Sequence, residues 1–321
     1  MTSFGVLLPH FGDVATVDRV IRTAPQLEAW GFRSVWTRDN VVFRGHGFEP
    51  EGTRLMDAFS TLSAIAMITD EMTVGTATLV PIRHPLLTSQ LLGGIANIAG
   101  PGRLIAGLGA GGQKKSFDVL GIDWDTRVQR VKEQFDVLRL SFNEEVFSYS
   151  GEFYDFEDAS IDPHPGPETP LWYGGSTPAS VRRAVEWGDG WFPGRCPMRT
   201  VDKRLETLRK GEQDQGRSLG FGIIPIVSID TSKEAALEKA NFEALCDVAR
   251  KNKWWDGPFD TPEDLSGMLI AGTVDDFKEE IAKFVARGCD QLVFDFRMRP
   301  GEYDEQVEWV ATEVLQEVGV A

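Results

Sequence analysis

Short apolar runs alternate with longer amphipathic segments along most of the chain. A short apolar run between turn residues predicts a buried strand, whereas apolar residues three or four positions apart predict one face of a helix. Eight runs predict strands, at residues 4–9, 34–37, 72–80, 104–108, 171–173, 190–192, 221–229 and 291–296. Because strands and helices alternate, the strands are expected to be parallel. Eight such units indicate a (β/α)₈ TIM barrel of the α/β class, with an open doubly wound sheet as the alternative.

The connection between the fourth and fifth predicted strands is longer than an ordinary crossover. It holds a helical pattern and then residues 145–149 and 152–156, which flank Ser150-Gly151 and predict a hairpin. We therefore interpret this middle segment as an insertion between two barrel strands. Residues 232–251, after the seventh predicted strand, have the pattern of one helix.

The charge, the cysteines and the apolar stretches of the chain exclude several classes of function. The chain has 321 residues, with 33 Lys and Arg against 49 Asp and Glu, which gives a net charge of −16. Such a charge argues against nucleic acid as a partner. The three cysteines are widely spaced, which disfavours a disulfide framework and favours a reducing compartment. No stretch resembles a signal peptide or reaches the ~20 apolar residues of a membrane span, so we expect a cytoplasmic protein without membrane partners.

Polar side chains follow the first two predicted strands. His10 comes after the first strand, and Asp39 and Asn40 come after the second. In a barrel of this type the chemistry is carried at the carboxyl ends of the strands. We expect these three residues to be catalytic or to orient the reacting groups, with His10 as a proton donor or acceptor. Asp39 has a second interpretation, in which it braces the amide of a neighbouring loop.

Two glycine-rich segments also follow predicted strands. Gly174-Gly175-Ser176-Thr177 comes directly before a helix, and such a segment suits a phosphate but also an ordinary capped helix start. The cluster at residues 107–112 lacks the spacing of a Rossmann fingerprint and could be either a wall against a flat ring or a turn. Trp172 and Trp191 lie near these glycines in the sequence and could line an aromatic slot.

Several other chemistries lack their sequence motifs. The four histidines form no zinc-protease motif and no cluster with carboxylates, so no metal site is expected. There is no nucleophile elbow and no P-loop. A barrel aldolase would need a lysine at a strand end, and none of the predicted strand ends inspected carries one.

Taken in order, several segments resemble the bacterial-luciferase-like flavin and deazaflavin oxidoreductases over about residues 4–296. The resemblance rests on residues 31–36 (Gly-Phe-Arg-Ser-Val-Trp), 76–85 (Thr-Ala-Thr-Leu-Val-Pro-Ile-Arg-His-Pro), 102–112, 151–154, 170–176, 184–191 and 272–277. No single motif is decisive, whereas their order and spacing together are specific.

The resemblance implies a TIM barrel with insertions after strands four and seven. We expect one domain over residues 1–321, with the insertions at about 113–168 and 240–270. The coenzyme would be F420 (a deazaflavin) or FMN, supported by a non-prolyl cis peptide at Ala77-Thr78 and bound through its phosphate. The expected coenzyme-binding residues are Ala77, Thr78, Val80, Gly109, Gly111, Gly112, Trp172, Gly174, Gly175, Ser176, Thr177 and Trp191. Relatives in this family are commonly homodimers.

The chain departs from both branches of the family at three positions. Asn40 stands where deazaflavin members often have a histidine, Gly112 where some have a glutamate, and Ala110 where FMN members often have an arginine. The expected function is hydride transfer between F420 and a small organic substrate. The alternatives are an FMNH₂-dependent monooxygenase that uses O₂ and, in another class, a non-catalytic flavin-binding protein.

Overall fold

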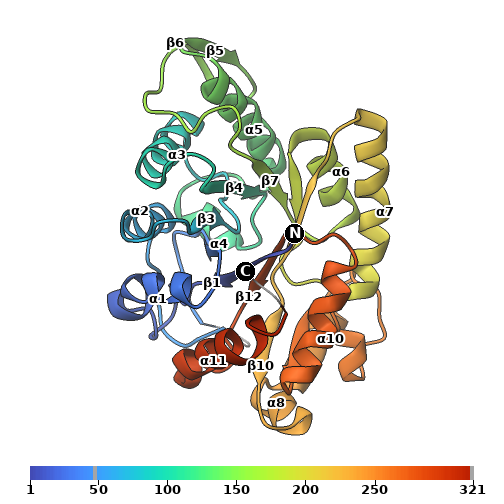
Figure 1. The fold of residues 1–321 in the computed structure, drawn as a ribbon. Helices are drawn as coiled ribbons and strands as arrows, with labels where there is room; N and C mark the ends of the chain where they lie inside the picture. The colour runs from blue at the N-terminus through green and yellow to red at the C-terminus, as the bar shows by residue number, and fades with distance from the viewer. Residues whose placement is uncertain (46–48, 319–321) are drawn as a thin grey trace.

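A closed parallel barrel forms the centre of the protein. The computed structural model describes residues 1–45 and 49–318 (Figure 1). The strands follow the order β1-β12-β9-β8-β7-β4-β3-β2 around the barrel, and every neighbouring pair is parallel. They are β1 (Ser3–Leu7), β2 (Ser34–Thr37), β3 (Thr73–Thr76), β4 (Leu104–Gly109), β7 (Leu171–Gly174), β8 (Gly190–Phe192), β9 (Gly220–Ile223) and β12 (Gln291–Phe294). The predicted (β/α)₈ architecture is therefore confirmed.

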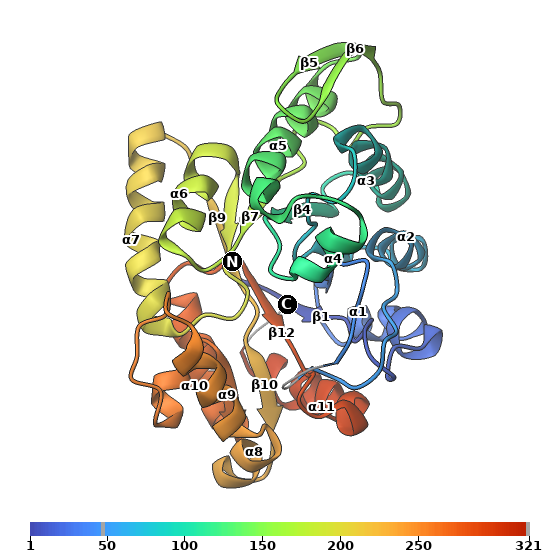
Figure 2. The same cartoon turned by 180° about the vertical axis from the view of Figure 1, so that it is seen from behind.

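Helices cover the outside of the barrel (Figures 1 and 2). They include α1 (Ala24–Ala29), α2 (Ala58–Ile68), α3 (Pro85–Ala99), α5 (Arg127–Asn143), α6 (Pro178–Trp187), α7 (Met198–Gln215), α10 (Val274–Val285) and α11 (Tyr303–Trp309). Shorter helical segments lie at Asp18–Arg22, Trp124–Thr126, Pro262–Leu265, Pro300–Glu302 and Val310–Leu315. Helix starts are fixed by side-chain caps: the Thr273 hydroxyl accepts from the Asp276 amide, and the Asp276 carboxylate accepts from the Thr273 amide.

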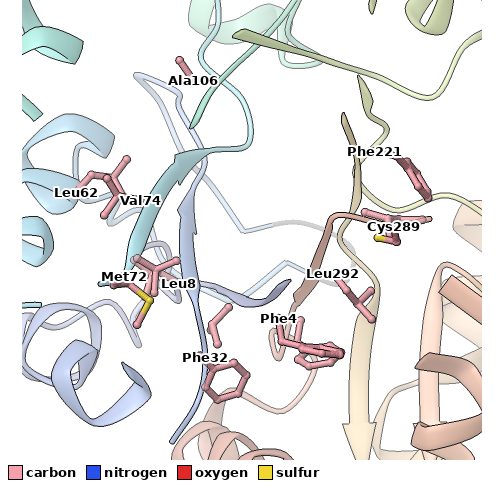
Figure 3. Close-up of a cluster of buried hydrophobic side chains, with 14 of the residues drawn as sticks. Phe4, Leu8, Phe32, Leu62, Met72, Val74, Ala106, Phe221, Cys289 and Leu292 are labelled. Atoms are coloured by element: carbon pink, nitrogen blue, oxygen red, sulfur yellow. The ribbon is translucent and has the colours of Figure 1, made fainter. Parts of the chain in front are cut away.

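Side chains alternate between two cores along each strand. Figure 3 shows part of the outer core, where Leu62 of α2 packs near Val74 of β3. The inner core fills the barrel with large side chains, namely Leu7, Trp36, Ile105, Trp172, Phe192, Ile224 and Val293. Because both faces of each strand are buried in a core, the strands appear in the sequence as continuous apolar runs.

The segment between β4 and β7 contains the predicted hairpin. It begins with α4 (Lys114–Val119), continues through the long helix α5, and reaches the antiparallel strands β5 (Phe147–Ser150) and β6 (Asp155–Ala159). The hairpin is confirmed, with its second strand three residues later than predicted. It projects away from the barrel beside the far end of α5 (Figures 1 and 2).

The prediction of one strand over residues 221–229 is wrong. The chain leaves the barrel after β9, and β10 (Ile226–Ile229) pairs with β11 (Leu269–Gly272) in a separate two-stranded parallel sheet. Pro225 lies at the break and has no amide hydrogen for a continuous ladder. The hydrophobic pattern does not mark the break because β9 and β10 are both almost fully buried.

The helix predicted over residues 232–251 is also interrupted. It consists of α8 (Lys233–Lys239) and α9 (Phe242–Lys251), and Asn241 between them has a φ of 52°. A residue in the left-handed region ends a helix, and asparagine tolerates that conformation better than most residues.

Candidate active site

A cleft of about 400 Å³ opens at the carboxyl ends of five neighbouring barrel strands. The segments after β3, β4, β7, β8 and β9 contribute its walls. It is lined by Ala77, Thr78, Gly109, Ala110, Gly111, Gly112, Arg127, Val128, Tyr173, Gly174, Gly175, Thr177, Ser180, Arg183, Phe192, Pro193, Gly194 and Ile224. Eight of the twelve coenzyme-binding residues expected from the sequence lie in it: Ala77, Thr78, Gly109, Gly111, Gly112, Gly174, Gly175 and Thr177.

The floor of the cleft is the irregular end of the third strand. β3 stops at Thr76, so the predicted strand over residues 72–80 is too long, and the Ala77–Thr78 peptide bond is cis, as the resemblance implies. The chain then rejoins the sheet, because the Leu79 amide donates to Gly107 (2.8 Å) and the Leu79 carbonyl accepts from Gly109 (2.9 Å). A bulge at Ala77–Thr78 therefore faces the cleft between two regular stretches.

The Thr78 side chain occupies the space where Gly109 and Gly174 have no β-carbon. A β-carbon on Gly109 would lie 2.6 Å from Thr78 Oγ1, and one on Gly174 would overlap Thr78 Cγ2. The Thr78 side chain is thus clamped between the ends of β4 and β7. These glycines shape the floor through Thr78, and both also line the cleft themselves.

The start of α6 forms the second end of the cleft. Gly175 has a φ of +135°, a conformation that glycine adopts readily. The Thr177 hydroxyl accepts from the Ser180 amide (3.1 Å) and caps the helix. The first amides of a helix have no partner within it and carry partial positive charge, so this end of the cleft suits an anion.

Two arginines missed by the sequence analysis strengthen this anion site. Arg183, one turn into α6, lines the cleft and donates to the Tyr173 hydroxyl (3.3 Å). Arg127 reaches the cleft from the start of α5, and its buried Nε has no hydrogen-bond partner among the described residues. Neither residue follows a strand, so a search restricted to strand ends could not find them. Phe192 and Ile224, also missed, form the apolar side of the cleft.

Asp39 braces the bulge. Its carboxylate is almost fully buried and accepts from the Val80 amide (3.1 Å) and from both terminal nitrogens of Arg83 (2.7 and 2.9 Å). The bidentate pair with Arg83 holds the carboxylate in place. The structure therefore gives Asp39 the second of its two predicted roles. Val80 is held through its backbone and does not line the cleft.

His10 lies beneath the rim of the barrel and is completely buried. Its Nε2 accepts from the Arg38 amide (3.0 Å), and its Nδ1 donates to the Leu8 carbonyl (2.9 Å). Burial and the neighbouring Arg38 lower the pKa of His10 to about 4. With both ring nitrogens bound to backbone and no wall of the cleft formed by it, His10 ties the end of β1 to the end of β2.

The remaining predicted residues lie behind the walls of the cleft. Asn40 accepts a long hydrogen bond from Ser116 (3.5 Å). Trp172 points into the barrel interior, and Trp191 lies in the outer core, where its Nε1 donates to the Gly175 carbonyl (2.8 Å). The Ser176 hydroxyl accepts from Trp255, which follows α9 in the chain (3.0 Å). Neither tryptophan lines the cleft: Trp172 packs in the barrel interior and Trp191 in the outer core, so they do not form the expected aromatic slot.

The arrangement fits a flat ring with a phosphate tail. The volume of the cleft falls in the range that small-molecule sites usually have, roughly 300–1,000 Å³. A ring would lie against Ala77–Thr78 and the apolar side chains of Phe192 and Ile224. The phosphate would be held by the amides at Gly175–Thr177 and by Arg183, with Arg127 supplying a further donor.

Within residues 1–45 and 49–318, no group of three or more His, Cys, Asp or Glu side chains is placed to hold a metal ion. The helices in the same two ranges include none with the length and apolar character of a membrane span.

Comparisons with known proteins agree with this geometry. A curated F420-dependent glucose-6-phosphate dehydrogenase from Nakamurella multipartita is 27% identical over 287 residues, which cover 83% of each chain. The structure of an F420-dependent secondary alcohol dehydrogenase in complex with an F420-acetone adduct has a TM-score of 0.80, at 18% identity and 99% coverage of both chains. A monooxygenase from Streptomyces bottropensis has a TM-score of 0.79, at 21% identity, and covers 99% of this chain and 100% of its own. The family model for luciferase-like monooxygenases matches residues 2–291, and the chain belongs to this luciferase-like family.

Proposed function

We propose that this protein is an F420-dependent oxidoreductase that transfers a hydride between the deazaflavin and a small organic substrate. The observation that carries the proposal is the cleft itself, whose lining combines the Ala77–Thr78 bulge with the cationic start of α6. The named relative from Nakamurella multipartita, which is F420-dependent, supports the choice of coenzyme. When bound, the deazaflavin would supply the hydride chemistry.

The residues of the chain would then bind the coenzyme, orient its ring and shield it from water. Arg183 and the amides at Gly175–Thr177 would fix the tail, while Thr78, clamped by its glycines, would set the plane of the ring. Phe192 and Ile224 would keep one side of the ring away from water. Asp39 is a positioning residue in this scheme, because it acts on the bulge through the Val80 amide.

Titration of the purified protein with F420 and with FMN, followed by quenching of coenzyme fluorescence, tests the proposal. We expect F420 to bind at least roughly tenfold more tightly than FMN. Replacing the cleft arginine, Arg183→Met, should weaken F420 by roughly 10- to 100-fold, since a charge-assisted hydrogen bond to phosphate is lost. Arg182→Met, the neighbouring arginine on α6 that does not line the cleft, is the matched control.

The alternative outcomes separate the remaining functions. Tighter binding of FMN would favour an FMNH₂-dependent monooxygenase. The structural likeness to the Streptomyces bottropensis monooxygenase is the reason to test this alternative. Binding of F420 without turnover of any alcohol or carbonyl substrate would favour a non-catalytic flavin-binding protein. Failure to bind either coenzyme would contradict the proposal.

We also propose that the protein forms a homodimer in the cytoplasm. Exposed apolar side chains gather on neighbouring helices, with Met67 and Ile68 on α2 and Leu87, Leu91 and Ile98 on α3. Large apolar side chains exposed on two neighbouring helices are typical of a protein interface. Light scattering should give twice the chain mass, and Leu91→Glu should give the monomer mass. The three buried cysteines, all without a disulfide partner, support a reducing compartment.

A further inference from the structure

The loop before α6 is held from behind by three side chains that do not line the cleft. Trp191 donates through Nε1 to the Gly175 carbonyl (2.8 Å). Arg204, on α7, donates through Nε to the Ser176 carbonyl in a longer hydrogen bond (3.4 Å). Trp255 donates through Nε1 to the Ser176 hydroxyl (3.0 Å). Donors from three distant parts of the chain therefore converge on one short loop.

The two bound carbonyls fix the direction of two amides. Both peptide bonds are trans, and in a planar trans peptide the carbonyl and the amide hydrogen point in opposite directions. The Gly175 carbonyl points to Trp191 in the outer core, so the Ser176 amide points away from that core. The Ser176 carbonyl points to Arg204, so the Thr177 amide points away from α7. Both amides are thus turned toward the side on which Gly175 and Thr177 line the cleft.

These two amides are available to a ligand. The Gly175 amide donates to the Phe192 carbonyl (3.1 Å), whereas the amides of Ser176 and Thr177 have no acceptor among residues 1–45 and 49–318. Thr177 caps α6 with its hydroxyl, which leaves its own amide unused. Two unpaired amides at the positive end of a helix suit a phosphate.

Trp255 reaches the loop from the segment after α9, and its chain neighbours fix that segment to α7. The Trp254 carbonyl accepts from Arg204 (3.2 Å), and the Asp256 amide donates to the Thr200 hydroxyl (2.8 Å). Trp255 itself is half-buried and packs against both the outer core and the separate core of α8, α9, β10 and β11. Arg204 therefore binds the loop and the segment that carries Trp255, and joins them into one unit.

We propose that Trp255 and Arg204 are positioning residues for the coenzyme phosphate. They act through Ser176, whose hydroxyl and carbonyl they hold, and so keep the Ser176 and Thr177 amides directed at the phosphate. The proposal rests on the proposed function, because it requires a coenzyme phosphate in the cleft, but it applies to F420 and FMN alike. Donors held in place before the ligand arrives bind it more tightly, since less freedom is lost on binding.

The test compares each coenzyme with a counterpart that lacks the phosphate. F420 is paired with the deazaflavin that ends at the ribityl chain, and FMN is paired with riboflavin. Quenching of ligand fluorescence by the full chain gives the four dissociation constants. The ratio within a pair, which we call the phosphate ratio, measures the advantage that the phosphate confers. Damage to the fold or to the ring site weakens both members of a pair and leaves the phosphate ratio unchanged.

Trp255→Phe keeps an aromatic ring and removes the donor. It should lower the phosphate ratio roughly tenfold, since the Ser176 peptide loses a hydrogen bond that holds it. Trp254→Phe is the matched control, because Trp254 is exposed and contacts Arg204 only through its backbone carbonyl. It should change the phosphate ratio by less than about twofold.

A second variant tests the other donor. Arg204→Met should also lower the phosphate ratio roughly tenfold, because both the Ser176 carbonyl and the Trp254 carbonyl lose their partner. Arg209→Met is its control, since Arg209 lies on the same helix but binds Glu212. Equal phosphate ratios in Trp255→Phe and Trp254→Phe would overturn the proposal. So would equal losses of affinity for both members of a pair, because the role would then be structural only.

The choice of coenzyme separates this proposal from the proposed function. If FMN binds more tightly than F420 and its phosphate ratio falls in Trp255→Phe, the positioning role stands and the F420 assignment falls. If F420 binds as expected and its phosphate ratio is the same in Trp255→Phe and wild type, the proposed function stands and the positioning role falls. Wild-type protein that binds both members of each pair equally well would overturn the positioning role, because no phosphate site would exist.

Discussion

The two sides of the barrel rim are built by different means. On the side of β3, β4 and β7, the shape depends on small residues, on the Ala77–Thr78 bulge and on the close packing of Thr78. On the side of β2 and β12, large charged side chains fill the rim and bind one another. The side of β3, β4 and β7 leaves a space for a flat molecule, whereas the side of β2 and β12 contains buried charged side chains.

This difference suggests a division of labour within one site. On the side of β3, β4 and β7, the bulge and the small residues leave room for the coenzyme that we propose, and Arg127 and Arg183 supply charge for its phosphate. On the side of β2 and β12, the buried arginines and carboxylates bind one another and hold the ends of the strands together. The comparison predicts that substitutions on the two sides change different measurements.

Asp39 connects the two sides, and its loss should have the largest effect. It follows β2 on the charged side but holds the bulge of the other side through Val80. Asp39→Ala leaves Arg83 and a buried amide without their partner, so urea denaturation should show a loss of about 3–5 kcal/mol in the free energy of unfolding. F420 affinity should also fall.

Asp57→Ala is the control for this substitution. Asp57 lies near the same arginine (3.8 Å) but is half exposed and mainly caps α2, so its loss should cost about 1 kcal/mol. Equal losses in the two variants would show that Asp39 does not brace the bulge.

His10 makes the charged side sensitive to pH. Its pKa is about 4 in the folded protein against 6.5 for the unfolded chain, so the unfolded state takes up the proton first as pH falls. The stability that neutral His10 provides is complete above pH 6.5 and is lost as pH falls from 6.5 to 4. The loss amounts to at most about 3 kcal/mol.

Urea denaturation at several pH values measures this contribution. His10→Asn should flatten the decline of stability between pH 6.5 and 4, whereas the same measurement on His164→Gln, which alters an exposed histidine, should follow wild type. A decline that persists unchanged in His10→Asn would show that other groups cause it.

A methyl group added on the side of β3, β4 and β7 should change stability and coenzyme binding through its contact with Thr78. Gly174→Ala places a carbon against Thr78 Cγ2, and overpacking of this kind costs about 1–3 kcal/mol and should displace the bulge. F420 affinity should therefore fall along with stability. Thr78→Ser removes the clashing methyl, so the double variant should recover most of both losses in a double-mutant cycle. A double variant no better than Gly174→Ala would contradict the clamp around Thr78.

The barrel was predictable because its strands are buried on both faces. Each strand therefore appears in the sequence as an apolar run, and eight such runs between helical patterns allow few other folds. The break at Pro225 was not visible in that pattern, since β9 and β10 are equally apolar although they belong to different sheets. The proline itself was the signal that could have located it.

The site was predictable only in part, for a physical reason. The glycines after β4 and β7 and the start of α6 each lie within a short stretch of sequence, so a search for local motifs finds them. Arg38, Glu49, Arg195 and Arg297 lie far apart in the chain and only the closed barrel brings them together. His10 shows the converse limit, because the residue type suggests proton transfer while its burial and backbone partners indicate a structural role.

The most direct test of this division of labour is a crystal structure of the protein with F420 bound. The account predicts a ring against the Ala77–Thr78 peptide and a phosphate at the amides of Gly175–Thr177, within hydrogen-bond distance of Arg183. A coenzyme phosphate bound away from Gly175–Thr177, or a ring bound away from Ala77–Thr78, would contradict it.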